Sequence, residues 1–161
     1  MTPFPHRYEV ALTDGPAPYA RLDAAGRETL TTAPPAEFGG PGDRWSPEHL
    51  LLAAVESCFL FTLRAVARAA ALPFSALDVH GCGLVDRRDG VTRFTEIVLR
   101  VRLVVAPGTD ADMTMRVLER SKRHCLVSAS LSTPVTLDAE IVESPDGQPL
   151  VPLAAAPCHT G

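Results

Sequence analysis

The residues of this chain most suited to chemistry are its four cysteines, Cys58, Cys82, Cys125 and Cys158. Cys58 lies within a long apolar segment, and Cys125 directly follows the basic stretch Lys122-Arg123-His124. A cysteine thiolate is both a nucleophile and a metal ligand, so the sequence raises two kinds of chemistry, thiol redox reactions and metal binding. Free cysteines are also common as small buried hydrophobes, and for either cysteine taken alone burial is the simpler interpretation.

The spacing of the cysteines and histidines argues against a metal site. The sequence has no C-x-x-C pair and no Cys/His pattern that is typical of zinc binding. Its two adjacent pairs, His124-Cys125 and Cys158-His159, join neighbours in the chain, which rarely chelate one metal well. We therefore expect neither a metal nor another cofactor, and we interpret Cys82 as structural and Cys158 as incidental.

Three features favour thiol chemistry at Cys58 and Cys125. Each cysteine belongs to one of two predicted helices that must pack near each other. Each also has charged residues close in sequence, which are Glu48 and Glu56 for Cys58 and the basic stretch for Cys125. The pair Glu56-Ser57 interrupts the most apolar part of its helix, which indicates a partly polar site inside the core.

The composition fits one domain, expected over residues 1–143, followed by a Pro/Ala-rich tail over residues 144–161. The 15 Lys and Arg against 19 Asp and Glu give a net charge of −4, which argues against a nucleic-acid or membrane-surface binder. We interpret the basic residues of 116–123 as the solvated face of a helix. The N-terminus does not resemble a signal peptide, so we expect a cytoplasmic protein, where disulfides are usually transient and catalytic.

The elements that must position the two cysteines follow from apolar periodicity and from turn residues. The expected strands span residues 6–13, 19–22, 28–32, 76–85, 91–105 and 134–142, and the expected helices span 46–71 and 110–124. Ser46-Pro47-Glu48 is a strong helix start, because it combines a capping hydroxyl, a proline at the first helical position and an acid at the positive end of the dipole. This order of elements predicts an α+β fold with an antiparallel sheet.

The first helix is apolar almost all round, from Leu50 to Leu63. A helix that is apolar on every side must be buried on every side. In a domain of this size, such burial requires a sheet that wraps around the helix or a partner subunit.

Two segments resemble the signatures of the OsmC/Ohr family, the osmotically inducible and organic-hydroperoxide-resistance proteins. The first runs from Ser46-Pro47-Glu48 through an apolar stretch to Cys58-Phe59, and the second is Ser121 to Ser128 around Cys125. The likeness covers residues 6–143 in register. It implies an OsmC-like fold, in which antiparallel sheets wrap around long central buried helices in an intertwined homodimer, with the active site at the subunit interface.

The resemblance also implies a set of catalytic roles. Cys58 would be the peroxidatic thiolate, Cys125 the resolving thiol that forms a disulfide with it, and Glu48 the carboxylate that orients an arginine. In a straight helix Glu48 and Cys58 are about 15 Å apart, at a rise of about 1.5 Å per residue, so a long arginine must bridge them. The implied partners are an organic hydroperoxide substrate and a lipoyl-type dithiol reductant.

The activating arginine is the point at which this sequence departs from the family pattern. The positions that we would align with the family arginine carry Pro16-Ala17-Pro18 or Phe38. The candidates are Arg21, Arg27 and Arg44, and we prefer Arg44 narrowly over Arg21. Arg44 also has a simpler interpretation, as a loop arginine that is paired with Asp43.

Three functions remain open from the sequence. The first is a thiol-dependent peroxidase that reduces organic hydroperoxides. The second is an OsmC-like binding protein for a small apolar ligand, in which the cysteines only pack, and the departure at the arginine favours it. The third is a redox sensor whose disulfide alters a partner surface, for which no DNA-binding motif gives support.

Overall fold

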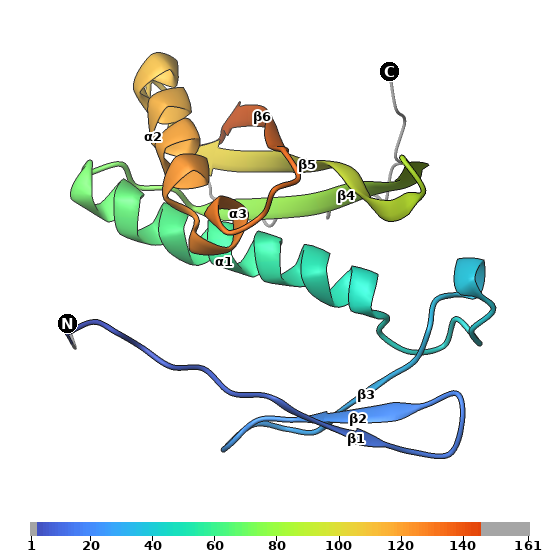
Figure 1. The fold of residues 1–161 in the computed structure, drawn as a ribbon. Helices are drawn as coiled ribbons and strands as arrows, with labels where there is room; N and C mark the ends of the chain where they lie inside the picture. Colours follow the sequence, from blue (N-terminus) through green and yellow to red (C-terminus); the bar gives the residue numbers. More distant parts are fainter. Residues whose placement is uncertain (1–2, 146–161) are drawn as a thin grey trace. The chain divides into compact units, whose positions relative to one another are not determined.

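The computed structural model describes residues 3–145, which belong to two compact units that divide at residues 51 and 52. The first unit contains a small antiparallel sheet in the order β1-β2-β3 (Figure 1). Its strands are β1 (Ala11–Asp14), β2 (Ala20–Asp23) and β3 (Leu30–Thr32). β2 and β3 pair antiparallel, and the turn between them contains Gly26 at a φ of 70°. A short 3-10 helix, η1 (Ala36–Phe38), follows.

The first predicted strand, residues 6–13, is wrong in its extent. Residues 6–10 are exposed and lie outside the ladder, and pairing begins at Ala11, which lies opposite Asp23. The physical reason is the length of β2, since its four residues offer partners only to the four residues of β1. Alternating side chains indicate an extended backbone, but a partner strand is needed to make it part of a sheet.

The long helix α1 (Pro47–Ala69) begins where its capping signals predict. The Ser46 hydroxyl accepts a hydrogen bond from the backbone N–H of His49 at 3.3 Å. The helix ends slightly before the predicted Ala71, because Ala71 takes a left-handed conformation with a φ of 52°. The N–H of Leu72 then donates to the carbonyl of Ala67 at 2.9 Å, a pattern that closes helix ends.

The second unit contains a three-stranded sheet in the order β4-β5-β6. Its strands are β4 (Ala76–Arg88), β5 (Val91–Val105) and β6 (Val135–Glu143). β4 and β5 form a long hairpin that is closed by Asp89 and Gly90, both with positive φ. Because this pair suffices for a tight turn, β4 extends to Arg88, beyond the predicted end at Val85.

The prediction of a purely antiparallel sheet is wrong for the last strand. β6 pairs with β5 in parallel, from Ile97 opposite Val135 to Val105 opposite Glu143. Between these strands the chain forms α2 (Ala111–His124) and α3 (Leu126–Ala129). A crossover through a helix returns the chain to the end of the sheet from which β5 started, and parallel pairing follows. The α+β class is confirmed, but with a mixed sheet.

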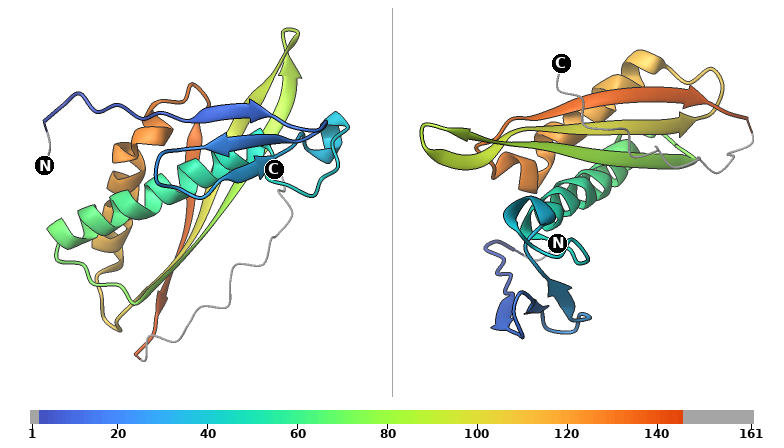
Figure 2. Two further views of the ribbon diagram at one scale, coloured as in Figure 1. Left: turned by 90° about the horizontal axis from the view of Figure 1, so that it is seen from below. Right: turned by 90° about the vertical axis from the view of Figure 1, so that its right-hand side faces the viewer.

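The core of the second unit lies between this sheet and its helices. The inward row of β5 is Ile97, Leu99, Val101 and Leu103, which are at most 2% exposed. These residues share one hydrophobic cluster with α1 and α2, which therefore pack on the same face of the sheet. Figure 2 shows α1 running along the sheet in two views.

Within the single chain, α1 is buried on one stripe only. Val55, Phe59, Leu63 and Ala67 are the fully buried residues of this helix, whereas Phe61 is 62% exposed. By length and composition α1 could also cross a membrane, a criterion that core helices of soluble proteins meet as well. Among residues 3–145, the predicted burial of α1 on every side is therefore not reached.

Candidate functional site

Helix α1 approaches β4 closely because β4 has glycines at the points of contact. A Cβ atom on Gly81 would lie 2.5 Å from Oε1 of Glu56, and one on Gly83 would lie 3.1 Å from Cδ2 of Leu52. The space that is left open at Gly81 lets the Glu56 carboxylate accept a hydrogen bond from the Gly81 N–H. The polar interruption that the sequence shows at Glu56 thus fixes α1 to the edge of the sheet.

The structure brings Cys58 and Cys125 together in the second unit. The Cys125 thiol donates to the carbonyl of Val55 at 4.0 Å, which places it against α1 one turn before Cys58. The backbone N–H of Val127 donates to Sγ of Cys58 at 3.5 Å. Both sulfur atoms therefore lie where the junction of α2 and α3 meets α1. Both cysteines are free thiols, and a disulfide between them would require their sulfur atoms to approach to about 2.05 Å.

The two thiols differ in exposure and surroundings. Cys125 is fully buried, whereas Cys58 is half-buried. Burial raises the pKa of the Cys125 thiol, and the hydrogen bond and charge of Cys58 act in the same direction. The side chain and backbone N–H of Ser128 oppose this by lowering the pKa of Cys125. The buried hydroxyl of Ser128 has no hydrogen-bond partner of ordinary geometry among residues 3–145.

Local structure at the end of α2 places Cys125. Asp110 caps this helix by accepting the N–H of Met113 at 2.9 Å, at the predicted start of the helix. Cys125 is the residue at which α2 ends and α3 begins. Its extended backbone turns the chain, so that its own side chain and the N–H of Val127 both face α1.

The predicted carboxylate, Glu48, belongs to the first unit. It lies in the first turn of α1, and its Oε2 atom is buried without a hydrogen-bond partner among the described residues. A buried carboxylate oxygen is costly unless a donor or a cation satisfies it. The orphaned oxygen is therefore compatible with a guanidinium partner, and the role of Glu48 remains a prediction.

The three candidate arginines also belong to the first unit. Arg44 forms an ion pair with Asp43 at 3.3 Å and lies over the ring of Tyr19 at 5.7 Å. Arg21 pairs with Asp23 at 3.6 Å, and Arg27 donates to the carbonyl of Gly26 at 3.1 Å. Each has contacts within its own unit, so which of them acts on Cys58 stays a prediction.

Sequence reasoning missed two donors at the sulfur atoms, the Val127 N–H and Ser128. A backbone N–H carries no signal in residue type, but Ser128 ends the second signature segment. Cys82 is a buried residue of β4 at 8% exposure, and Cys158 lies outside the described residues. Within residues 3–145, no three His, Cys, Asp or Glu side chains converge as metal ligands.

Comparisons with known proteins bear on the same segments. The family model for OsmC-like proteins matches residues 40–140, which include both cysteines. The uncharacterised protein YmaD of Bacillus subtilis is 27% identical over 109 residues, which are 66% of this chain and 73% of YmaD. Peroxiredoxin OsmC of Escherichia coli is 29% identical over 96 residues, which are 60% of this chain and 66% of that protein.

Solved structures share the fold. An OsmC-like protein of unknown function from Vibrio cholerae has a TM-score of 0.78 at 14% identity, and the match covers 84% of this chain and 99% of that one. An organic hydroperoxide resistance protein from Elizabethkingia anophelis has a TM-score of 0.69 at 17% identity and covers 88% of this chain and 100% of its own. The fold is therefore OsmC-like, and because the family model spans more than half of the sequence, this chain belongs to the family of OsmC-like proteins.

Proposed function

We propose that this protein is a cytoplasmic, thiol-dependent peroxidase that reduces organic hydroperoxides. The observation that carries the proposal is the placement of two free thiols, a half-buried Cys58 and a fully buried Cys125, where the junction of α2 and α3 meets α1. The family includes peroxiredoxin OsmC and organic hydroperoxide resistance proteins, which supports the same chemistry.

In the first step, the Cys58 thiolate attacks one oxygen of the peroxide. An S–O bond forms, the O–O bond breaks, and the alcohol leaves after it takes up a proton, so Cys58 becomes a sulfenic acid. The Val127 N–H would stabilise negative charge on the Cys58 sulfur, because hydrogen bonds to a charged form favour it. Arg44, oriented by Glu48, would stabilise the thiolate and the departing oxygen.

In the second step, Cys125 attacks the Cys58 sulfur. An S–S bond forms, the S–O bond breaks, and hydroxide leaves as water with the proton of Cys125. The burial that raises the pKa of Cys125 keeps its proton in place until Cys58 has been oxidised. A lipoyl-type dithiol then supplies the two electrons that restore both thiols, and is itself oxidised to a disulfide.

We also infer a homodimer. Phe61 of α1 is 62% exposed, and Tyr8, Val10 and Leu12 of the N-terminal segment are between 64% and 89% exposed. Large apolar surfaces of this kind on a soluble chain indicate an interface. A second copy would complete the burial of α1 that its apolar sequence requires.

A second candidate is a binding protein for a small apolar ligand, without peroxidase turnover. This binding function is favoured because the two preferred candidate arginines, Arg44 and Arg21, are each paired with an acidic side chain. Under this function the thiol contact would be packing only.

Peroxide consumption with dihydrolipoamide separates the two functions. We expect the protein to consume cumene hydroperoxide faster than hydrogen peroxide, and mass spectrometry after one equivalent of peroxide to find a Cys58–Cys125 disulfide. A protein that stays reduced and does not consume either peroxide would instead be a binding protein.

A further inference from the structure

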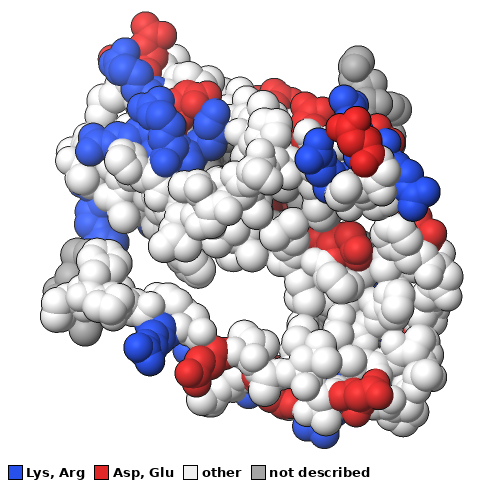
Figure 3. Space-filling model, viewed as in Figure 1, with Lys and Arg blue, Asp and Glu red and all other residues white. Residues whose placement is uncertain are grey.

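A row of arginines lies on α2, beside the C-terminal half of α1. Arg116, Arg120 and Arg123 follow one another at helical spacing, which places them on one face of the helix. Figure 3 shows Lys and Arg side chains gathered over α2 and the adjoining end of α1. None of the three arginines has an acidic partner among residues 3–145. They therefore leave positive charge uncompensated on a chain whose net charge is −4.

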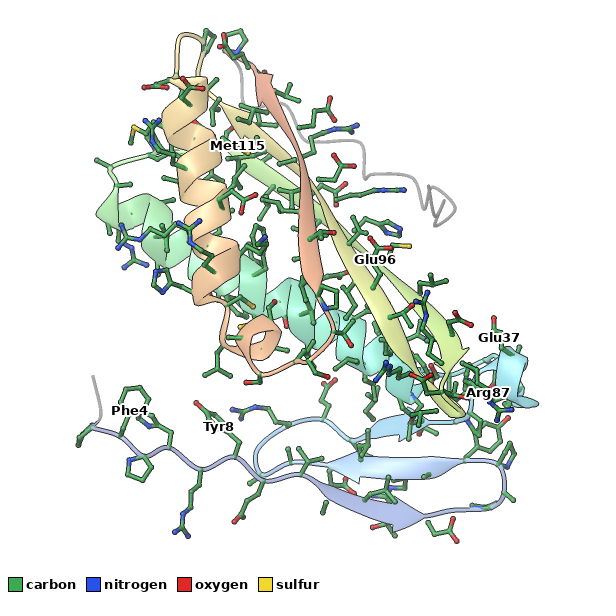
Figure 4. All side chains as sticks on the ribbon, turned by 45° about the horizontal axis from the view of Figure 1, so that its top comes forward. Phe4, Tyr8, Glu37, Arg87, Glu96 and Met115 are labelled. Atoms are coloured by element: carbon green, nitrogen blue, oxygen red, sulfur yellow. The ribbon has the colours of Figure 1, made fainter. Side chains whose placement is uncertain are left out.

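These arginines border a cleft of about 710 Å³ between the two helices. The apolar residues that line it are Val66 and Ala70 of α1 and Met113 and Val117 of α2. Met115 also lines the cleft, and Figure 4 shows it on α2. An ordinary solvated helix face has no such apolar floor, so the interpretation of residues 116–123 as solvated surface is incomplete.

Two carboxylates line the same cleft, Asp112 and Glu119. Glu119 is paired with Lys122 at 3.4 Å, which compensates its charge. Asp112 lies in the first turn of α2, whereas Arg120 and Arg123 lie toward its last turn. The cleft is thus polarised, with its positive end near the end of α2.

We propose that this cleft binds an unbranched medium-chain carboxylate. Arg120 and Arg123 would hold the carboxylate, because guanidinium groups match its planar pair of oxygens. The alkyl chain would cover Val66, Ala70, Val117 and Met113, since each buried methylene adds affinity. A free inorganic anion would leave the apolar floor uncovered, and a neutral lipid would leave the arginines without a partner. The ligand carries no peroxide, so this site is independent of the proposed peroxidase chemistry.

Methionine methyl resonances offer a direct test in the full-length reduced protein. The chain has three methionines, and two of them, Met113 and Met115, line the cleft. With ¹³C-methyl methionine, titration with octanoate is expected to shift both resonances saturably. Acetate has the head group without the chain, and octylammonium has the chain with the opposite charge, so neither is expected to reproduce the shifts.

Paired variants test the role of the arginines. Arg120→Gln with Arg123→Gln keeps good helix formers on α2 and is expected to weaken octanoate binding at least about tenfold. The matched control, Arg87→Gln with Arg88→Gln, removes the same charge at the β4–β5 turn, which Figure 4 shows at the opposite end of the second unit from Met115. It is expected to change binding less than about twofold.

Three results would overturn the proposal. The first is an absence of octanoate-dependent shifts at both Met113 and Met115. The second is an equal response to octylammonium, which would mean that the chain alone binds. The third is equal weakening by the two paired variants, which would reduce the effect to net charge.

Discussion

The surroundings of Cys58 and Cys125 differ in how completely this one chain builds them. Cys125 ends an amphipathic helix whose inward residues, Val117 and Leu118, reach the core, and its sulfur is fully enclosed. Cys58 lies on a helix that is apolar nearly all round but buried on one stripe only. Under the proposed function, a peroxide would reach the half-buried sulfur of Cys58, and the enclosed sulfur of Cys125 would react only in the second step.

Serine substitutions should separate the two sulfurs most strongly. Cys58→Ser is expected to lower peroxide turnover by about a thousandfold or more, because the attacking thiolate is gone. Cys125→Ser is expected to release about one equivalent of alcohol per chain and then to slow, because the sulfenic acid has no internal thiol to attack it. Rapid-quench measurement of the alcohol distinguishes a burst from steady turnover, and equal kinetics in the two variants would contradict separate roles.

Two phenylalanines of α1 allow the comparison to be sharpened on one helix. Phe59→Ala is expected to lower the free energy of unfolding by about 3–5 kcal/mol, because Phe59 is fully buried and its loss leaves a cavity. Phe61→Ala is expected to change the free energy of unfolding of the single chain only slightly, and to weaken the dimer instead. Chemical denaturation and analytical ultracentrifugation measure the two effects, and an unchanged association constant for Phe61→Ala would count against burial of this face by a second copy.

Gly81 tests how α1 is held against β4. Gly81→Ala is expected to cost about 1–3 kcal/mol, because the new methyl group would displace the Glu56 carboxylate and leave a partly buried donor unsatisfied. In a Glu56→Ala background the same change should cost less, since the obstructing side chain is absent. A double-mutant cycle measures this coupling, and strict additivity would show that the contact has no energetic role.

The sequence predicted some parts of the fold and of the candidate site better than others. The strand expected over residues 91–105 is confirmed as β5, because alternation of apolar residues with period 2 is visible in the sequence. The direction of β6 was missed, because alternation does not encode whether a partner strand is parallel. The meeting of Cys58 and Cys125 was expected from their two signature segments. The activating arginine stayed open among Arg44, Arg21 and Arg27, because a long side chain on a loop or short strand can pair with a neighbouring acid as readily as with a distant thiolate.

The raised pKa of Cys125 predicts how stability depends on pH. The folded protein holds the Cys125 proton more tightly than the unfolded chain, in which a thiol titrates near about 8.5. Its contribution is therefore complete below that value and is lost as the pH rises toward the folded pKa. The stability of the reduced wild type relative to Cys125→Ala should fall as the pH rises above about 8.5. A difference that is flat over this range, measured by denaturation under reducing conditions, would argue against the raised pKa.

The smallest expected effect is at Ser128. Its side chain lowers the pKa of Cys125, so Ser128→Ala should raise that pKa further and slow formation of the disulfide. We expect a decrease of about threefold to tenfold in the resolving step, since a single hydrogen bond to a sulfur is worth about 0.5–1.5 kcal/mol. The attack of Cys58 on the peroxide should be unchanged, because Ser128 acts on the enclosed sulfur. Stopped-flow kinetics resolves the two phases, and Ser128→Thr, which keeps the hydroxyl, serves as the control. If Ser128→Ala slowed the first phase instead, Ser128 would act on Cys58 and not only on Cys125. That result would contradict the proposed division between an accessible Cys58 and an enclosed Cys125.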